Sequence, residues 1–339
     1  MSPSALRFEE LVRLILEAND FSISRDPTEI PDAGFDFKAR WLNDVWAVEV
    51  KFYRTARAQV SLLNSAASRL ASRGVSAGVE KGLLIVSCQL SPALKTALEE
   101  KFSVTFVDRA DLTMWATKTP SLVDELNSLF ESDADVFLER TGNPAERTQH
   151  SKPLARLVSE EDKQGTYLCQ ELAALDRGRG NWSKYEQLCD RILRYLFPID
   201  LHGWHKQRRT DDGLNRFDYV CRMQPATEFW RFLIQHLDSR YVLFEFKNYR
   251  AKIKQGQILT TEKYLLERGL RKVAIIICRV GADADAVKMT QGAMREHGKL
   301  MLIVDDNQVC QMLHMKERGE DPTDHLFELA DKFLLSLPR

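Results

Sequence analysis

Residues 45–51, VWAVEVK, decide the fold of the first half of this chain, because they form a hydrophobic strand that ends in Glu-x-Lys. Side chains alternate between the two faces of a strand, so Glu49 and Lys51 project together while the valines beside them point to the opposite, buried face. Twelve residues separate Asp36 from Glu49, and the turn signal Asn-Asp at 43–44 lies between them. This spacing predicts a hairpin that brings Asp36 next to Glu49 on the neighbouring strand.

The second half of the chain repeats this pattern. Residues 241–247, YVLFEFK, end in Glu245-x-Lys247, and Asp218 precedes them. Twenty-six residues separate Asp218 from Glu245, and the segment 226–238, ATEFWRFLIQHLD, predicts a short helix inserted into the hairpin.

Both triplets occupy the same place in a repeated order of predicted elements, helix–strand–strand–strand–helix–strand–helix–strand. Such alternation predicts an α/β fold in which each half has a mixed central sheet flanked by helices. We expect one domain at 1–112 and another at 181–339. Residues 113–180 are acidic and partly helical in pattern, and they are expected to form a connector.

The three side chains of each triplet suit phosphodiester hydrolysis. Two carboxylates can hold a Mg²⁺ ion that keeps several waters and accepts phosphate oxygens. Such an ion lowers the pKa of a bound water and stabilises charge on the phosphate. The lysine could orient or deprotonate the attacking water, or stabilise the charged phosphate. The alternative is that each Glu-x-Lys is an ordinary surface ion pair, which the repetition of the whole pattern disfavours.

The ordered motifs resemble the PD-(D/E)XK nuclease superfamily, whose fold is that of the restriction endonucleases. FEELVRLIL at 8–16, GFDF at 34–37 and VEVKFYR at 48–54 resemble its Mrr-type branch, and RFDYV at 216–220 with FEFKNYR at 244–250 resembles a second restriction-endonuclease-like domain. The resemblance implies these catalytic residues: Asp36, Glu49 and Lys51 in the first half, and Asp218, Glu245 and Lys247 in the second. Within them, the implied metal ligands are Asp36, Glu49, Asp218 and Glu245. One departure from the family pattern is that Phe, not Pro, precedes each Asp.

Four further residues are candidate accessory groups. The superfamily often has an acid of the first helix near the metal, and this position maps to Glu9 and Glu186. Their alternative role is to satisfy the helix dipole as first-turn acids. Gln59 and Gln255 each lie eight residues after the lysine of their half, where a side-chain amide could contact a phosphate or a metal-bound water. Their alternative is an ordinary solvated helix position.

Clusters of basic residues flank the predicted sites, where phosphate must approach, and Lys or Arg there would add salt-dependent affinity for DNA. The alternative is that they belong to an ordinary charged surface. The candidate nucleic-acid contacts are Arg54, Lys206, Arg208, Arg209, Arg250, Lys252 and Lys254.

Composition fits a globular protein without strong overall charge. The chain has 339 residues, is 44% hydrophobic and carries a formal net charge of −1. Its six cysteines stand singly, which predicts reduced thiols in a cytoplasmic protein, and its six tryptophans are expected in the core. The acidic residues within the apolar N-terminal stretch do not fit a signal peptide, and no apolar run is long enough for a membrane span.

The resemblance thus implies a Mg²⁺-dependent DNA endonuclease, with Mn²⁺ as a possible substitute, acting in bacterial restriction or anti-phage defence. RNA as a substrate and pairing as a homodimer stay open. The alternative is a subunit of a defence complex that binds nucleic acid without cutting it, or that cuts only when a partner activates it.

Overall fold

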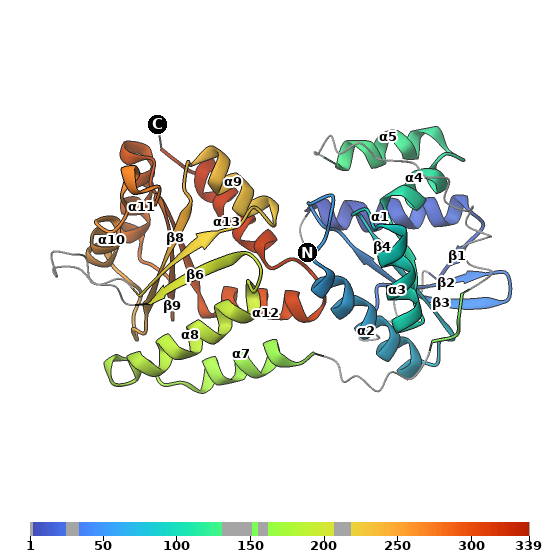
Figure 1. Ribbon diagram of the computed structural model, residues 1–339, viewed down its shortest axis with the longest axis horizontal. Helices are drawn as coiled ribbons and strands as arrows, with labels where there is room; N and C mark the ends of the chain where they lie inside the picture. Colours follow the sequence, from blue (N-terminus) through green and yellow to red (C-terminus); the bar gives the residue numbers. More distant parts are fainter. Residues whose placement is uncertain (1–2, 25–33, 131–150, 155–161, 207–217, 339) are drawn as a thin grey trace. The chain divides into compact units, whose positions relative to one another are not determined.

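The computed structural model describes residues 3–24, 34–130, 151–154, 162–206 and 218–338. The chain divides into two compact units, one of residues 1–162 with 317–321 and the other of residues 163–316 with 322–339. Each unit contains one five-stranded sheet (Figure 1). The structure therefore confirms the predicted α/β class, with a mixed sheet flanked by helices in each half.

The first unit has the element order that the sequence predicts. Its strands, in chain order, are β1 (Ser22–Ile23), β2 (Phe37–Trp41), β3 (Asp44–Lys51), β4 (Lys81–Val86) and β5 (Thr105–Val107). Its helices are α1 (Pro3–Ala18), α2 (Val60–Ser76), α3 (Pro92–Phe102), α4 (Arg109–Ala116) and α5 (Pro120–Leu129). The strands lie in the order β1-β2-β3-β4-β5, with β1, β2 and β3 antiparallel and β3, β4 and β5 parallel.

Strand alternation gives this sheet two apolar faces, each covered by helices. Trp46 and Val48 pack in one core with residues of α1, α4 and α5. Ala47, between them in sequence, packs in the other core with residues of α2 and α3. Three layers result, and the central strand β3 is enclosed on both sides.

The second unit repeats this architecture with additional helices. Its strands are β6 (Leu201–Lys206), β7 (Tyr219–Met223), β8 (Tyr241–Lys247), β9 (Val273–Cys278) and β10 (Leu300–Asp305). Its longer helices are α7 (Gln164–Ala174), α8 (Trp182–Leu196), α9 (Glu228–His236), α10 (Gln255–Glu262), α11 (Ala284–His297), α12 (Asp306–Glu317) and α13 (Thr323–Leu335). Two short 3₁₀ helices are η1 (Arg179–Asn181) and η2 (Glu267–Gly269).

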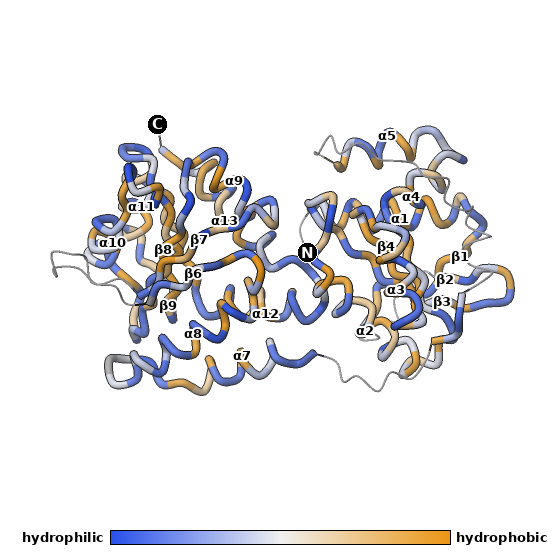
Figure 2. The backbone as a smooth tube through the Cα atoms, viewed as in Figure 1, coloured by the Kyte–Doolittle hydropathy of each residue, from blue (hydrophilic) through white to orange (hydrophobic). Residues whose placement is uncertain are grey.

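The second sheet has the order β10-β9-β8-β7-β6 and the same mixture of pairings, antiparallel for β6–β7–β8 and parallel for β8–β9–β10. Figure 2 shows hydrophobic segments along its central strands, and β9 is buried along its whole length. Helix α9 lies between β7 and β8 in the chain, so the predicted helical insertion in the hairpin is confirmed.

The segment 113–180, expected to be a connector, contains helices that pack on the units at either end. α4 and α5 contact α1 in the first unit, and α7 contacts α8 in the second. The proposed domain boundaries stay a prediction. Within the described residues, no helix is both long enough and apolar enough to cross a membrane.

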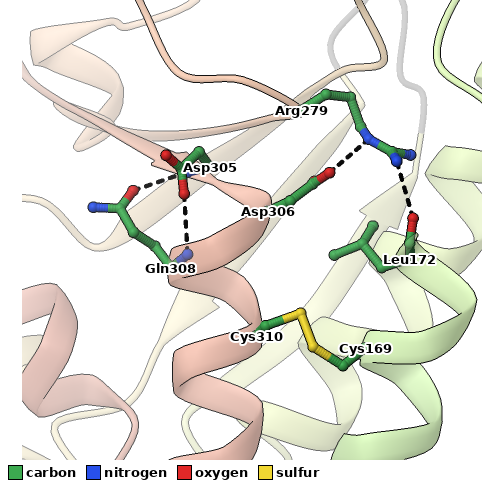
Figure 3. The surroundings of a disulfide bond; sticks show 7 residues. All are labelled: Cys169, Leu172, Arg279, Asp305, Asp306, Gln308 and Cys310. Atoms are coloured by element: carbon green, nitrogen blue, oxygen red, sulfur yellow. Dashed lines mark hydrogen bonds and ion pairs between the residues drawn. A yellow bond between two sulfur atoms is a disulfide. The ribbon is translucent and has the colours of Figure 1, made fainter.

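The cysteines differ in part from the expectation of six reduced thiols. Cys169 of α7 and Cys310 of α12 form a disulfide bond (Figure 3). Single cysteines 141 residues apart carry no spacing signal for such a pair, because only the packing of the two helices brings them together. The other four cysteines are buried free thiols: Cys88, Cys189, Cys221 and Cys278.

Candidate active sites

The hairpin of β2 and β3 places Asp36 beside the Glu-x-Lys strand. Phe37 pairs with Val48, so the next antiparallel position sets Asp36 opposite Glu49. The Asp36 N–H donates to the Val48 carbonyl oxygen at 3.0 Å. Its carboxylate Oδ2 accepts a hydrogen bond from the Val50 N–H at 2.6 Å. The carboxylate is therefore held against the middle residue of Glu-x-Lys.

Glu49 and Lys51 form a buried ion pair in this first site. The Lys51 Nζ lies 2.6 Å from Glu49 Oε1, and the two side chains are only 6% and 3% exposed. Burial, with repulsion from Glu49, raises the pKa of Asp36 to about 7. Burial disfavours the charged form of Lys51, but Glu49, Glu320 and Asp36 outweigh it and raise the pKa of the ammonium group. The carboxylates of Asp36, Glu49 and Glu320 therefore outnumber the single ammonium group of Lys51, so the site has excess negative charge when all of them are ionised.

The second site has the same construction on β7 and β8. Tyr219 pairs with Phe244, which sets Asp218 opposite Glu245. Asp218 Oδ2 accepts a hydrogen bond from the Phe246 N–H at 2.8 Å, and Lys247 Nζ lies 2.5 Å from Glu245 Oε1. Burial, with repulsion from Asp218, raises the pKa of Glu245 to about 7. Both triplets are therefore assembled by one backbone plan, despite the helix inserted in the second.

One carboxylate oxygen in each site has no hydrogen-bond partner among the described residues. It is the same atom in both, Oε2 of Glu49 and Oε2 of Glu245. An unpaired buried carboxylate oxygen is costly unless a cation or a donor reaches it. Within the described part of the chain, no cluster of three or more His, Cys, Asp or Glu side chains forms a complete metal cage. Each pair of carboxylates nevertheless matches the one or two that Mg²⁺ commonly takes from a protein.

The second site opens into a pocket of about 470 Å³. Asp218, Lys247 and Glu186 line it, so the candidate accessory residue Glu186 lies in the same pocket as two residues of the triplet. In the first site, Glu9 contributes to the raised pKa of Asp36, which puts it within electrostatic reach of that carboxylate. Glu9 also pairs with Arg13 at 2.8 Å.

The two candidate glutamines lie at the helices that follow the Glu-x-Lys strands β3 and β8. Gln59 is the N-cap residue of α2, just before the helix rather than on it, and Gln255 is the exposed first residue of α10.

The basic candidates are placed only in part. Arg250, Lys252 and Lys254 are exposed and follow β8, and Arg54 is half-buried after β3. Arg208 and Arg209 lie outside the described residues. Lys206 ends β6, and its side chain is likewise outside the description.

A segment that sequence reasoning missed also reaches the first site. Residues 317–321, which belong to this unit, bring Glu320 Oε1 to 3.6 Å from Lys51 Nζ. The Tyr53 hydroxyl donates to the Gly319 carbonyl oxygen at 2.6 Å. A Cβ at Gly319, whose φ is +71°, would lie 2.5 Å from the Leu62 carbonyl oxygen, so only glycine fits there. In the sequence, only Gly319 indicates that this segment packs closely against another part of the chain, and it does not indicate that the segment contacts the first site.

Asn248, one residue beyond Lys247 of the second candidate site, was also missed by sequence reasoning. It is buried, and its side-chain amide donates to the carbonyl oxygens of Asp176 at 3.3 Å and Gly178 at 3.0 Å. Nearby, Arg279 contacts Asp306 at 2.7 Å and the Leu172 carbonyl oxygen at 2.9 Å (Figure 3). These bonds fix the end of α7 and the loop that follows it against the ends of the strands that carry the candidate site.

Comparison with known protein families finds a match to the N-terminal part of the first unit. Residues 2–116 match the family Mrr_cat, described as a restriction endonuclease. This match bears out the Mrr-like assignment of the first half and supports a nuclease function, and it does not extend to the second half. No curated protein matches the chain.

Proposed function

Starting from a restriction endonuclease domain at its N-terminal end, we propose that this protein is a metal-dependent DNA endonuclease with two sites that hydrolyse phosphodiester bonds. Its role is bacterial restriction or anti-phage defence. The observation that carries the proposal is the repeated triplet, in which an Asp accepts the N–H of the residue between Glu and Lys in both units. An accidental surface ion pair has no reason to recur with this backbone contact and this burial.

The residues present fit a divalent ion. Asp36 with Glu49, and Asp218 with Glu245, would hold Mg²⁺ or Mn²⁺, and the orphaned Oε2 atom of each glutamate would gain a partner. When bound, such an ion supplies Lewis-acid stabilisation of the phosphate and lowers the pKa of a coordinated water.

The lysines act as cations in this proposal. The pKa of Lys51 and the pKa of Lys247 are both raised, because the neighbouring carboxylates outweigh the effect of burial. A group that holds its proton this firmly is a poor general base at neutral pH. In the metal-free protein both lysines are therefore cations suited to stabilise charge on the phosphate oxygens, and a divalent ion held by the same carboxylates would lower their pKa.

Exposed cations beside the second site give DNA a place to bind. Arg250, Lys252 and Lys254 follow the catalytic strand directly and are exposed. Each phosphate that they neutralise would release counterions, so affinity is expected to fall steeply as salt concentration rises.

The test is cleavage of plasmid DNA with Mg²⁺ by the wild-type protein and by Asp36→Asn, Asp218→Asn and the double variant. Asparagine keeps an oxygen that can accept the strand N–H, so the hairpins should survive while the charge is lost. Lys51→Ala and Lys247→Ala provide a second pair of variants.

Matched controls are Lys118→Ala and Lys288→Ala, whose side chains are 52% and 75% exposed. We expect each site variant to lose the cleavage of its own site, the double variant to be inactive and both controls to cut normally. Cleavage that survives in the double variant would overturn the site assignment. A wild-type protein that binds nucleic acid but never cuts it would favour the non-cleaving alternative.

A further inference from the structure

Two exposed aromatic side chains stand in the pocket of the second site. Trp182 is 46% exposed and Tyr249 is 36% exposed, and both line the pocket that contains Asp218 and Lys247. The expectation that all six tryptophans are core residues is therefore wrong for Trp182. By contrast, Trp46, Trp115 and Trp230 are completely or almost completely buried. The exposed part of each ring can be reached by a ligand that enters this pocket.

The platform that carries Trp182 is fixed to the catalytic strand. Trp182 is the first residue of α8, and the loop before it is bonded to the chain that follows Lys247. The Gly178 N–H donates to the Asn248 carbonyl oxygen at 2.9 Å, and the Asn248 side chain returns a bond to Gly178 at 3.0 Å. Arg250 Nε donates to the Arg177 carbonyl oxygen at 3.2 Å. The backbone just before Trp182 therefore has little conformational freedom to lose when a ligand binds in the pocket.

The pocket combines two chemistries that a nucleotide needs together. The pocket is lined by Lys247 and by the carboxylates of Asp218 and Glu186, beside the aromatic groups. A phosphate and its metal would therefore bind next to the flat rings of Trp182 and Tyr249. Its volume of about 470 Å³ lies within the usual range of small-molecule pockets. Every base has a π-face, so stacking on an aromatic side chain tolerates any sequence.

Stacking on a side chain also distinguishes single-stranded from double-stranded nucleic acid. A base inside a duplex is covered on both faces by its neighbours, whereas an unpaired base can lie on a side chain. We propose that the second site binds an unpaired nucleotide whose base stacks on Trp182 or Tyr249, so that its preferred substrate is single-stranded DNA. This inference rests on the proposed nuclease function and adds the substrate class of its second site.

The first experiment measures binding without cleavage. A fluorescently labelled oligothymidine and a labelled duplex are titrated with wild-type protein, Trp182→Ala and Tyr249→Ala in EDTA. The matched control is Tyr167→Ala, because Tyr167 is 57% exposed on α7 of the same unit but does not line the pocket. Loss of one stacked base is expected to weaken binding of oligothymidine about 5- to 150-fold. Binding of the duplex should change much less, and Trp182→Phe should restore part of the affinity. Equal effects of Trp182→Ala, Tyr249→Ala and the control would overturn the inference.

The second experiment measures cleavage with Mg²⁺ in the Lys51→Ala background, which isolates the second site. Faster cutting of single-stranded than of duplex DNA, lost with Trp182→Ala, supports the inference. Faster cutting of the duplex overturns the inference and leaves the nuclease function standing. If no DNA is cut while Trp182→Ala still weakens oligothymidine binding, the nuclease function of this site fails and the binding specificity stands.

Discussion

Asp36→Asn should stabilise the metal-free first unit while it removes the chemistry of that site. Burial and Glu49 raise the pKa of Asp36 from 3.8 to about 7, so the folded protein resists the ionisation that the unfolded chain undergoes freely. For a carboxyl with a raised pKa, stability falls as pH rises from about 4 to 7 and then stays low. The difference between the two pKa values corresponds to about 4 kcal/mol at pH 8. Because Asp36 is half-buried by solvent accessibility, we expect about 2–3 kcal/mol after discounting for solvent.

The assay is hydrogen exchange by mass spectrometry in EDTA, following peptides of β3 and β4, which report on the first unit separately from the second. The gain from Asp36→Asn should be about 2–3 kcal/mol at pH 8 and less than half of that at pH 5. Asp20→Asn is the control, since Asp20 is 86% exposed and its pairing with Lys118 should contribute little. Added Mn²⁺ should stabilise the wild-type protein but not Asp36→Asn. If Asp36→Asn were less stable than the wild-type protein at pH 8, the argument that burial disfavours the ionised form of Asp36 would be refuted.

Three further predictions concern the second unit. Burial lowers the pKa of His325, so the free energy of unfolding should fall as pH drops below about 6.5, because the unfolded chain binds the proton more readily. In denaturant titrations at pH 7.5 and 5.5, His325→Phe should lose less stability between the two pH values than the wild-type protein. Cys169→Ser should lower the free energy of unfolding by about 2–5 kcal/mol. Dithiothreitol should destabilise the wild-type protein but not this variant. Equal sensitivity of both proteins to dithiothreitol would exclude the Cys169–Cys310 bond. Asn248→Ala should release the loop at Gly178 and increase the hydrogen exchange of residues 176–182. The control is Gln291→Ala, which removes a half-buried amide on α11; unchanged exchange in Asn248→Ala would contradict the proposed anchoring.

The arrangement of the two Asp…Glu-x-Lys triplets was predictable because it depends on local geometry. Alternation along one strand sets Glu49 beside Lys51, and a hairpin of short length sets the register that brings Asp36 opposite. The same reasoning survives in the second half because α9 extends the hairpin without changing the pairing of Tyr219 with Phe244. Because the pattern occurs twice, the interpretation of each triplet is supported by the other.

The features that sequence reasoning missed depend on contacts between distant segments. Trp182 begins an amphipathic helix, and nothing in the local pattern distinguishes its exposed ring from a buried one. The loop before it is held by Asn248, a residue whose contacts appear only when that loop packs on the end of β8. Cys169 and Cys310 meet for a similar reason, since α7 and α12 pack side by side only in the folded unit. Hydrophobic periodicity identifies the faces of such helices but not their neighbours.

The return of residues 317–321 to the first unit has a consequence for biosynthesis. Translation at roughly 5–20 residues per second would leave an interval of roughly 8–30 s between the emergence of residue 162 and that of Gly319. During that time the nascent N-terminal unit can fold its sheet, but it lacks the hydrogen bond from Tyr53 and the carboxylate of Glu320 beside Lys51. The candidate site that is encoded first is thus completed only after all five strands of the second sheet have been translated.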